Sequence, residues 1–532
     1  MSNEISFSDL QSVIVEKRQK ELRDLRKRCD KHFFYFAEYV DSDKPNNFFS
    51  RDKPHAMLIS MLYDLIDRGI IKKVTISLPP RGGKSWGTSK ALQWQLGKHP
   101  EKTNMRNSYS AGLAVDVLSH QVRQSVLDPL FSQLYQIELD PAAKAKPKWN
   151  LKGSTRPSYC AAGIGGTSSG VGVDNWIVLD DEYSGMEQAM SKSIRRQTDN
   201  WIDSVHLARR EGDFKELYVC TRWTEHDRIG QLKRYEDNYE IDFTKYLAMF
   251  EKEDVTDKRF EYIFKMFKKE VKANMKDVNT LVSLTVPALV TVDGEERSYC
   301  PAIFSTAHYL EERSRYKKRG QMWIWWSVFM QKPEASGNKI FQEINRFSPN
   351  RLWNLYDKPM VIAYIDPAFV PGGDYLAMPI AKVIDGSLYI VDVIYSKKGR
   401  DFTIPQIIKK VERWGITQIE GEGNGSGDEF LRTVREKLNA KGLYCSVKII
   451  KNSGDKVARV MMRSGDVVER CHFLNKEDYP NSKEDEYSNF MYDLLGSNVE
   501  LDQDNDDAPD SMSGLVYMRG GMPNSQANYE PL

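Results

Sequence analysis

The sequence predicts two α/β domains in one chain, a parallel-sheet domain of the P-loop (ASCE) type followed by an RNase H-like domain. Three observations favour these folds. An apolar strand runs into a glycine-rich loop and a helix between residues 74 and 96, two more apolar strands end in polar groups near residues 180 and 221, and β-rich runs precede alternating helices and strands after residue 361. A chain of 532 residues is long enough for more than one domain.

The segment from Val74 to Leu96 has the layout of a phosphate-binding loop. Backbone N–H groups of such a loop and of the helix after it point at phosphate oxygens. In this role the Lys84 ammonium reaches the β/γ-phosphates and the Ser85 hydroxyl binds Mg²⁺. The usual first glycine of the motif would fall at position 78, where this chain has Leu78. The pattern alone therefore also fits a strand, turn and helix that bind no nucleotide. The expected nucleotide contacts are Pro80, Arg81, Gly82, Gly83, Lys84 and Ser85.

A second strand, Trp176–Leu179, delivers three carboxylates at its carboxyl end, where ligands bind in open α/β sheets. Two assignments are open. An enzyme that hydrolyses a nucleotide triphosphate needs one acid to hold Mg²⁺ and another to polarise the water that attacks the γ-phosphate. Either Asp180 holds Mg²⁺ and Asp181 polarises the water, or these roles belong to Asp181 and Glu182. A solvated acidic turn after a buried strand is the simpler alternative.

A third strand, Glu216–Cys220, ends in the polar residues Thr221 and Arg222 and in Trp223. In P-loop motors a polar group at such a strand end can sense the γ-phosphate, so Thr221 and Arg222 are candidate nucleotide contacts. Arg222 could equally be a surface charge, and Trp223 a packing residue.

The last third of the chain begins with β-rich runs at residues 361–369, 376–384 and 387–395, joined by hairpin-type turns. A helix at Ile404–Trp414 and a strand at Ile416–Ile419 follow. Three strands and then alternating helix and strand are the arrangement of an RNase H-like fold.

Carboxylates in this region predict a site for two divalent metals. Hard cations such as Mg²⁺ and Mn²⁺ prefer carboxylate oxygens, and two of them need ligands from distant parts of the chain. Asp507 and Asp510 would share one face of the last helix, with Asp506 pointing elsewhere. A solvated acidic loop is the simpler alternative for that run. The expected metal ligands are Asp366, Glu420, Asp506 and Asp507, with Glu422 and Asp374 as auxiliary candidates.

Together these segments resemble the large terminase subunit of tailed bacteriophages, the motor that packages DNA into a procapsid. The resemblance runs from about residue 30 to 520. In that family a Pro-Pro-Arg loop without the first glycine is usual, whereas proline often follows the Asp-Asp pair, where this chain has Glu182. The motifs that carry it are Leu78–Ser85, Gly165–Gly170, Asp180–Asp181, Thr221–Trp223, Met330–Pro333, Ile365–Ala368, Ile419–Glu420 with Gly425, Asp455–Lys456 with Arg459, and Asp506–Asp510.

The resemblance implies a DNA-packaging ATPase with a metal-dependent endonuclease that cuts concatemeric DNA. ATP and Mg²⁺ are the implied cofactors, and Mn²⁺ is also plausible at the nuclease site. The implied partners are double-stranded DNA, the portal protein of the procapsid, the small terminase subunit and further copies of the chain in a ring, by resemblance a pentamer. In the family Lys456 and Arg459 lie near the nuclease site. The implied catalytic residues are Asp181, Glu182, Asp366, Glu420 and Asp507.

Composition fits this interpretation. The net charge of +1 is uninformative because 76 basic and 75 acidic residues nearly cancel. No apolar run approaches the 18 or so residues that a membrane span needs, so no membrane partner is expected. Six cysteines without a C-x-x-C pair argue against a disulfide framework or a zinc site. With no signal peptide at the start, we expect the host cytoplasm as the location.

We expect four parts along the chain. Residues 1–30 form a charged helix, and residues 31–345 form the P-loop domain with a charged lid or linker at about 250–335. Residues 346–518 form the RNase H-like domain, and residues 519–532 form a flexible tail.

Two other functions remain open from the sequence. One is a P-loop helicase or repair translocase joined to an RNase H-like nuclease, although no additional helicase-type motif set lies between Thr221 and Pro333. The other is a structural DNA-binding or portal-docking protein with a degenerate ATPase, for which Leu78 would be the evidence.

Overall fold

The computed structural model divides the chain into two compact units. The first contains residues 1–311 and 326–333, and the second contains residues 312–325 and 334–532. The expected flexible tail, residues 1–6 and the pair Ser168 and Ser169 lie outside the described residues. The structure describes residues 7–44, 48–142, 145–167, 170–252, 254–333, 340–341, 344–349, 359–368, 372–451, 455–480, 485–497 and 506–518.

The first unit is built on an eight-stranded sheet in which every neighbouring pair is parallel except β3 and β4. One strand, β6, lies between β1 and β5. The first of these two leads into the glycine-rich loop, and the second ends at Asp180. This interposed strand is the mark of the ASCE type, so the predicted fold class is confirmed for this unit. In spatial order the strands are β3 (Lys148–Trp149), β4 (Tyr159–Gly163), β2 (Asn104–Ser108), β5 (Trp176–Asp180), β6 (Lys215–Val219), β1 (Lys73–Ser77), β8 (Leu281–Thr285) and β7 (Asn238–Glu240).

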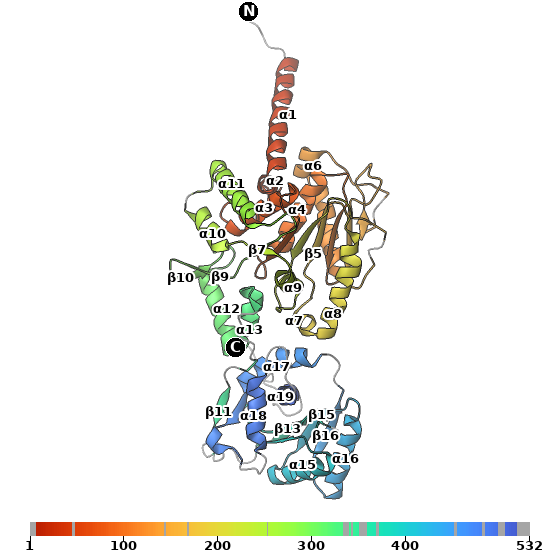
Figure 1. The fold of residues 1–532 in the computed structure, drawn as a ribbon, viewed down its shortest axis with the longest axis vertical. Helices are drawn as coiled ribbons and strands as arrows, with labels where there is room; N and C mark the ends of the chain where they lie inside the picture. The colour runs from red at the N-terminus through yellow and green to blue at the C-terminus, as the bar shows by residue number, and fades with distance from the viewer. Residues whose placement is uncertain are drawn as a thin grey trace, which may run out of the picture. The chain divides into compact units, whose positions relative to one another are not determined.

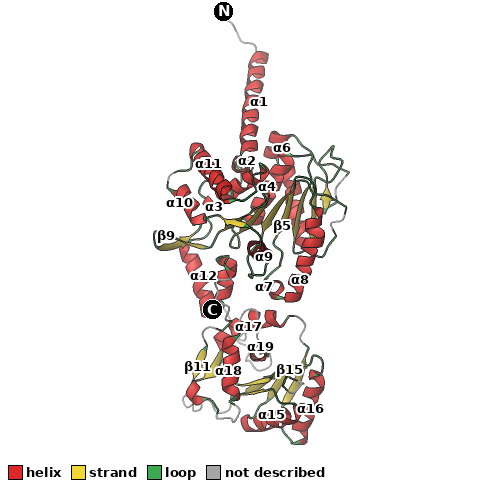
Figure 2. Ribbon diagram, in the orientation of Figure 1, coloured by secondary structure: helices red, strands yellow, loops and turns green. Residues whose placement is uncertain are grey.

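Helices flank this sheet, and the long first helix projects from the body of the unit (Figures 1 and 2). A small antiparallel hairpin, β9 (Leu289–Val292) and β10 (Glu295–Ser298), stands apart from it. The helices are α1 (Phe7–Lys31), α2 (Phe33–Val40), α3 (Pro54–Asp67), α4 (Lys84–Lys98), η1 (Gly112–Ser119), α5 (His120–Val126), α6 (Pro129–Tyr135), α7 (Met186–Met190), α8 (Lys192–Trp201), η2 (Ile202–His206), η3 (Leu207–Arg209), α9 (Arg228–Tyr235), α10 (Phe243–Glu251) and α11 (Asp257–Asn274). Two further helices, α12 (Thr306–Lys318) and η4 (Trp325–Phe329), have residues in both units, and α13 (Met322–Ile324) belongs to the second.

The second unit is built on a seven-stranded mixed sheet. Its strands β14, β13, β12, β15 and β16 lie in this order, with β13 antiparallel to both neighbours and β12, β15 and β16 parallel to one another. This is the strand order of an RNase H-like fold, which confirms the second predicted fold class. In spatial order the strands are β11 (Asn345–Phe347), β17 (Cys471–Leu474), β14 (Ser387–Ser396), β13 (Leu376–Ile384), β12 (Val361–Ile365), β15 (Gln418–Glu422) and β16 (Ser446–Ile450).

The helices of the second unit follow the predicted alternation with the strands. The helix predicted from Ile404 begins four residues earlier, at Arg400, so that Pro405 lies inside its first turns. The helices are α15 (Arg400–Trp414), α16 (Gly427–Ala440), α17 (Lys456–Arg470), η6 (Lys476–Asp478), α18 (Glu486–Gly496) and α19 (Asp507–Tyr517).

The strand predicted at Ile416–Ile419 is displaced in the structure. It is β15, which runs from Gln418 to Glu422 and pairs on both sides, with β12 and with β16. Glu420, Gly421 and Glu422, which lie beyond the predicted end of the strand, are part of it, because pairing with two neighbours outweighs the weak strand propensity of Glu and Gly. This shift changes which carboxylate lies at the strand end.

A buried histidine in the first unit predicts acid sensitivity. Burial, with the charge of Arg228, lowers the pKa of His206 to about 3, and Asn107 Nδ2 lies 2.8 Å from its Nδ1. The folded chain therefore favours neutral His206, and between pH 6.5 and about 3 the unfolded chain binds more protons. Stability from this group is present above pH 6.5 and is lost as the pH falls through that window.

We therefore expect urea unfolding midpoints of the wild-type chain to fall more steeply between about pH 6.5 and 4 than those of His206→Gln. The matched control is the exposed His120→Gln, which should follow the wild type. Equal slopes for wild type and His206→Gln would contradict the prediction.

Candidate nucleotide and metal sites

The loop between β1 and α4 has the backbone of a phosphate cradle. Gly83, which precedes the helix, has φ 81°, and a Cβ at this position would overlap the Phe48 ring. Only glycine fits both demands. Arg81 also has a positive φ of 62°, and the Gly82 N–H donates to Pro79 O at 3.1 Å. The loop therefore turns tightly into the N-terminus of α4, where backbone donors are available to an anion.

Lys84, the first residue of α4, contacts the ends of two other strands. Its Nζ lies 3.0 Å from Asp181 Oδ2 and 2.6 Å from Thr221 Oγ1. Asp181 Oδ1 in turn accepts from the Thr221 N–H at 2.7 Å. Burial alone would lower the pKa of Lys84, but the Asp181 and Asp180 carboxylates raise it above its usual value. Lys84 is therefore a cation fixed at the carboxyl ends of β5 and β6.

Ser85 and Asp180 form the second contact of the loop. The Ser85 hydroxyl donates to Asp180 Oδ1 at 3.0 Å, and Asp180 is buried at the end of β5. A hydroxyl and a carboxylate at this distance are the oxygen donors that Mg²⁺ prefers. The donor set therefore fits a Mg²⁺ held by Ser85 and Asp180 beside a bound nucleotide.

Glu182, a candidate for polarising the water, points away from this group. It is buried, its Oε1 accepts from the Arg228 N–H at 2.7 Å, and its Oε2 has no hydrogen-bond partner among the described residues. Burial and the nearby Asp227 raise the pKa of Glu182 well above its usual value. Of the two assignments that the sequence leaves open, the contacts favour Asp180 with Asp181 over Asp181 with Glu182.

Replacing each acid by its amide tests this choice. Asp181→Asn should lower ATP turnover by about 100-fold or more, since a general base contributes roughly that much. Glu182→Gln should keep most of the activity, because the amide still accepts from Arg228. Steady-state ATP hydrolysis and nucleotide binding are measured together. Loss of turnover in Glu182→Gln with binding intact would instead support the assignment of Asp181 and Glu182.

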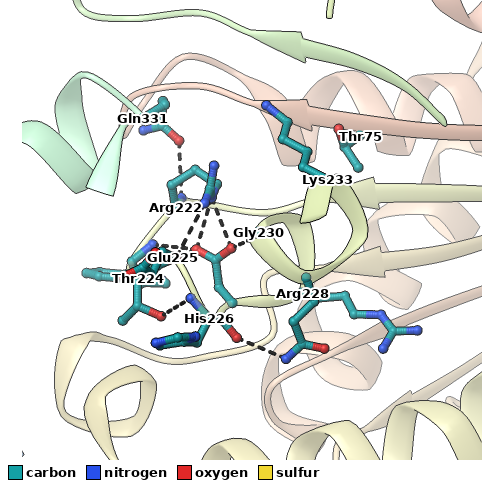
Figure 3. Close-up of polar contacts among 12 residues, drawn as sticks. Thr75, Arg222, Thr224, Glu225, His226, Arg228, Gly230, Lys233 and Gln331 are labelled. Carbon is teal, nitrogen blue, oxygen red and sulfur yellow. Dashed lines mark hydrogen bonds and ion pairs between the residues drawn. The ribbon is translucent and has the colours of Figure 1, made fainter. Parts of the chain in front are cut away.

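Arg222 contacts a loop of its own unit and not Lys84 in the described structure. Its Nε lies 3.0 Å from both carboxylate oxygens of Asp227, the residue that caps α9. The side chain of Arg222 is only 4% exposed. The Arg222 N–H donates to Gln331 Oε1 at 3.1 Å (Figure 3). The contacts thus place Thr221 beside the loop lysine and give Arg222 a structural partner. A nucleotide contact by Arg222 stays a prediction.

The second unit brings three carboxylates together at the carboxyl ends of its strands. Oxygens of Asp366, Glu422 and Asp510 all lie within 4.8 Å of one another. Ile365 pairs with Gly421 in the parallel ladder of β12 and β15, so the next residues, Asp366 and Glu422, lie level. Asp366 Oδ2 is buried without a hydrogen-bond partner in the described structure. An acidic cluster with such an oxygen fits a divalent cation.

The predicted ligand Glu420 lies outside this cluster. It is level with Tyr364, one pleat earlier on β15, and its Oε1 accepts from Gln418 at 2.9 Å and from Lys448 at 3.3 Å. The carboxylate of β15 in the cluster is instead Glu422, which the sequence suggests only as an auxiliary ligand, and metal binding by Glu420 stays a prediction. The other auxiliary candidate, Asp374, lies in the turn before β13.

On α19, Asp510 lies in the cluster, whereas Asp507 contacts other groups, and metal binding by Asp507 stays a prediction. Asp507 Oδ2 accepts from the Tyr375 N–H at 2.8 Å, and its Oδ1 lies 3.3 Å from Lys456. Asp506, expected to point elsewhere, lies 2.8 Å from the same lysine. Because Asp510 is one turn further along the helix, it reaches Glu422 and Asp366.

Two cations of α17 balance the acidic cluster. Lys456 Nζ lies 3.8 Å from both Asp366 and Asp510, and Arg459 lies 2.9 Å from Asp510 and 3.6 Å from Glu422. Burial raises the pKa of Asp366 well above its usual value, with Lys456 opposing this and Asp510 adding to it. The Asp366 carboxyl is therefore more easily protonated than an exposed carboxyl group.

No protein-family model matches the chain, and no curated protein matches it. Several solved structures are similar to it. They include the large terminase of a thermophilic bacteriophage in complex with ADP, at 12% identity over 87% of this chain and 98% of that chain, with a TM-score of 0.37. The large terminase of bacteriophage HK97 is 10% identical over 85% of this chain and 94% of that chain, with a TM-score of 0.30.

The nuclease domain of the large terminase subunit of bacterial virus Sf6 is also similar, at 12% identity over 30% of this chain and 90% of that chain, with a TM-score of 0.23. All three TM-scores are below 0.5. No helix among the described residues is long and apolar enough to cross a membrane.

Proposed function

We propose that this chain is the large subunit of a viral terminase, an ATP-driven translocase of double-stranded DNA that also carries a metal-dependent endonuclease. One observation carries the proposal. A single chain combines a phosphate-loop site in an ASCE-type sheet with a separate cluster of three carboxylates at the strand ends of an RNase H-like sheet. A motor that moves DNA and then cuts it needs both.

In the motor site, Lys84 would stabilise charge on the phosphate that is transferred to water. Ser85 and Asp180 would hold Mg²⁺, which neutralises phosphate charge when it is bound. Asp181 would accept the proton of the attacking water, and the Thr221 N–H holds this carboxylate in place at 2.7 Å. Thr221 thus links the water-binding residue to the neighbouring strand β6.

In the nuclease site, Asp366, Glu422 and Asp510 would hold divalent cations, Mg²⁺ or Mn²⁺, which supply an activated water and stabilise the leaving oxygen when bound. Lys456 and Arg459 would orient these carboxylates. Asp507 would keep the turn at Tyr375 against α19 through its 2.8 Å hydrogen bond.

The proposed partners follow from this activity. They are double-stranded DNA, the portal protein of a procapsid, a small terminase subunit and further copies of the chain in a ring, and the chain would act in the cytoplasm of the host cell.

Two assays of the purified chain test the proposal against its alternatives. Stimulation of ATP hydrolysis by double-stranded DNA is expected, and its absence would favour a structural protein with a degenerate ATPase. A forked duplex should not be unwound in the presence of ATP. Unwinding would favour a helicase joined to a nuclease, while ATP-dependent DNA uptake by procapsids would support the terminase.

A further inference from the structure

Arg106, on β2, is the most deeply buried arginine of the described residues. Its side chain is 0% exposed, and β2 lies between β4 and the acidic strand β5. Removing a guanidinium from water is strongly unfavourable unless close partners compensate for the lost hydration. The groups around Arg106 therefore indicate why the charge is there.

Those groups are the central parts of the motor site. Arg106 Nε donates to Asp180 Oδ2 at 3.0 Å, and Nη2 contacts the same oxygen. Nη2 also donates to the backbone oxygen of Ser85 at 2.9 Å, and Nη1 donates to Ser89 Oγ at 2.7 Å. One side chain thus joins the end of β5 to the first two turns of α4.

This arrangement leaves the two oxygens of Asp180 with different tasks. Oδ2 is held by Arg106, and Oδ1 faces the Ser85 hydroxyl at 3.0 Å. Without Arg106 the Asp180 carboxylate could rotate. The guanidinium would also no longer join Asp180 to the backbone oxygen of Ser85 at the start of α4.

We propose that Arg106 is a positioning residue that presents Asp180 Oδ1 and the Ser85 hydroxyl together to the Mg²⁺ of a bound nucleotide. The inference rests on the proposed nucleotide site. It predicts that the geometry of the guanidinium matters as well as its charge, because a lysine ammonium cannot span Asp180, Ser85 O and Ser89 at once.

The test uses the full chain and the fluorescent nucleotide mant-ATP, titrated at a series of Mg²⁺ concentrations. In Arg106→Lys, the Mg²⁺ concentration that gives half of the Mg²⁺-dependent gain in binding should rise by about 10-fold or more, as for other residues that orient metal ligands. The control is Lys90→Met, which removes another buried ion pair of α4, with Asp41 at 2.8 Å, away from Asp180. It should leave the Mg²⁺ dependence unchanged.

Ser89→Ala is the second variant, and it decides the matter if Arg106→Lys does not fold. It removes one acceptor of Arg106 and should raise the required Mg²⁺ concentration in the same direction, by less. If Arg106→Lys folds and its Mg²⁺ dependence is unchanged, the inference is overturned and the ion pair is purely structural. If Arg106→Lys does not fold, an unchanged Mg²⁺ dependence in Ser89→Ala has the same meaning. Wild-type binding that does not respond to Mg²⁺ would also overturn the inference. Because the fluorescence reports binding and not turnover, a wild type that binds mant-ATP but does not turn over ATP would count against the proposed function alone.

Discussion

Lys84→Ala is expected to lower ATP hydrolysis by about 100-fold or more, the loss typical of removing one group that stabilises transition-state charge. The ammonium lies between Asp181 and Thr221 at the ends of β5 and β6, and no other cation of the loop shares these contacts in the described structure. Steady-state release of phosphate measures the loss, while cleavage of plasmid DNA with Mn²⁺ should be unchanged, since its carboxylates belong to the other unit.

The control for this variant is Lys98→Ala at the far end of the same helix. Lys98 pairs with Asp67 and contacts neither Asp180 nor Asp181 in the described structure. It should retain ATP turnover. Near-normal turnover in Lys84→Ala would show that the loop does not bind the transferred phosphate.

Glu422→Gln is expected to lower DNA cleavage by about 100-fold or more, because it removes an anionic oxygen from a site whose cations each contribute several kcal/mol. Glu420→Gln is its matched control, with the same chemistry two residues earlier on the same face of β15. Glu420 lies level with Tyr364, whereas Glu422 is level with Asp366, so the control should cut DNA normally.

Nicking of supercoiled plasmid in Mn²⁺ measures both variants, and a thermal melting curve of each variant reports whether it is folded. The reverse result, with cleavage lost in Glu420→Gln and kept in Glu422→Gln, would restore the ligand set predicted from the sequence.

The sequence was sufficient to predict both fold classes, because several strands beside the sites are apolar runs. Trp176–Leu179 is apolar throughout and β13 has the predicted bounds, Leu376–Ile384. The polar residues after β5 and β6 then follow from the rule that parallel strands present their carboxyl ends together.

Arg106 escaped prediction because its strand has no apolar pattern. Residues 104–108 read Asn-Met-Arg-Asn-Ser, yet all five are buried. Their burial arises from pairing with β4 and β5, which are distant in sequence. A polar strand of this kind is indistinguishable from a loop until its neighbours are known.

The position of Glu422, and not Glu420, in the cluster with Asp366 has a different cause. Both acids are visible in the sequence, but which one meets Asp366 depends on the register between β12 and β15. The strand was predicted to end at Ile419 and ends at Glu422. A shift of this kind changes which carboxylate lies level with Asp366. The same holds on α19, where Asp507 and Asp510 share a face and only the packing against β13 and α17 separates their roles.

The central claim is that one chain carries two chemically separate sites, and a crossed measurement of both activities tests it most directly. DNA-stimulated ATP hydrolysis and EDTA-sensitive DNA cleavage are measured for the wild type, Lys84→Ala and Glu422→Gln. We expect both activities in the wild type, cleavage alone in Lys84→Ala and ATP hydrolysis alone in Glu422→Gln. A wild type that lacks either activity, or a variant that loses both while it remains folded, would contradict the claim.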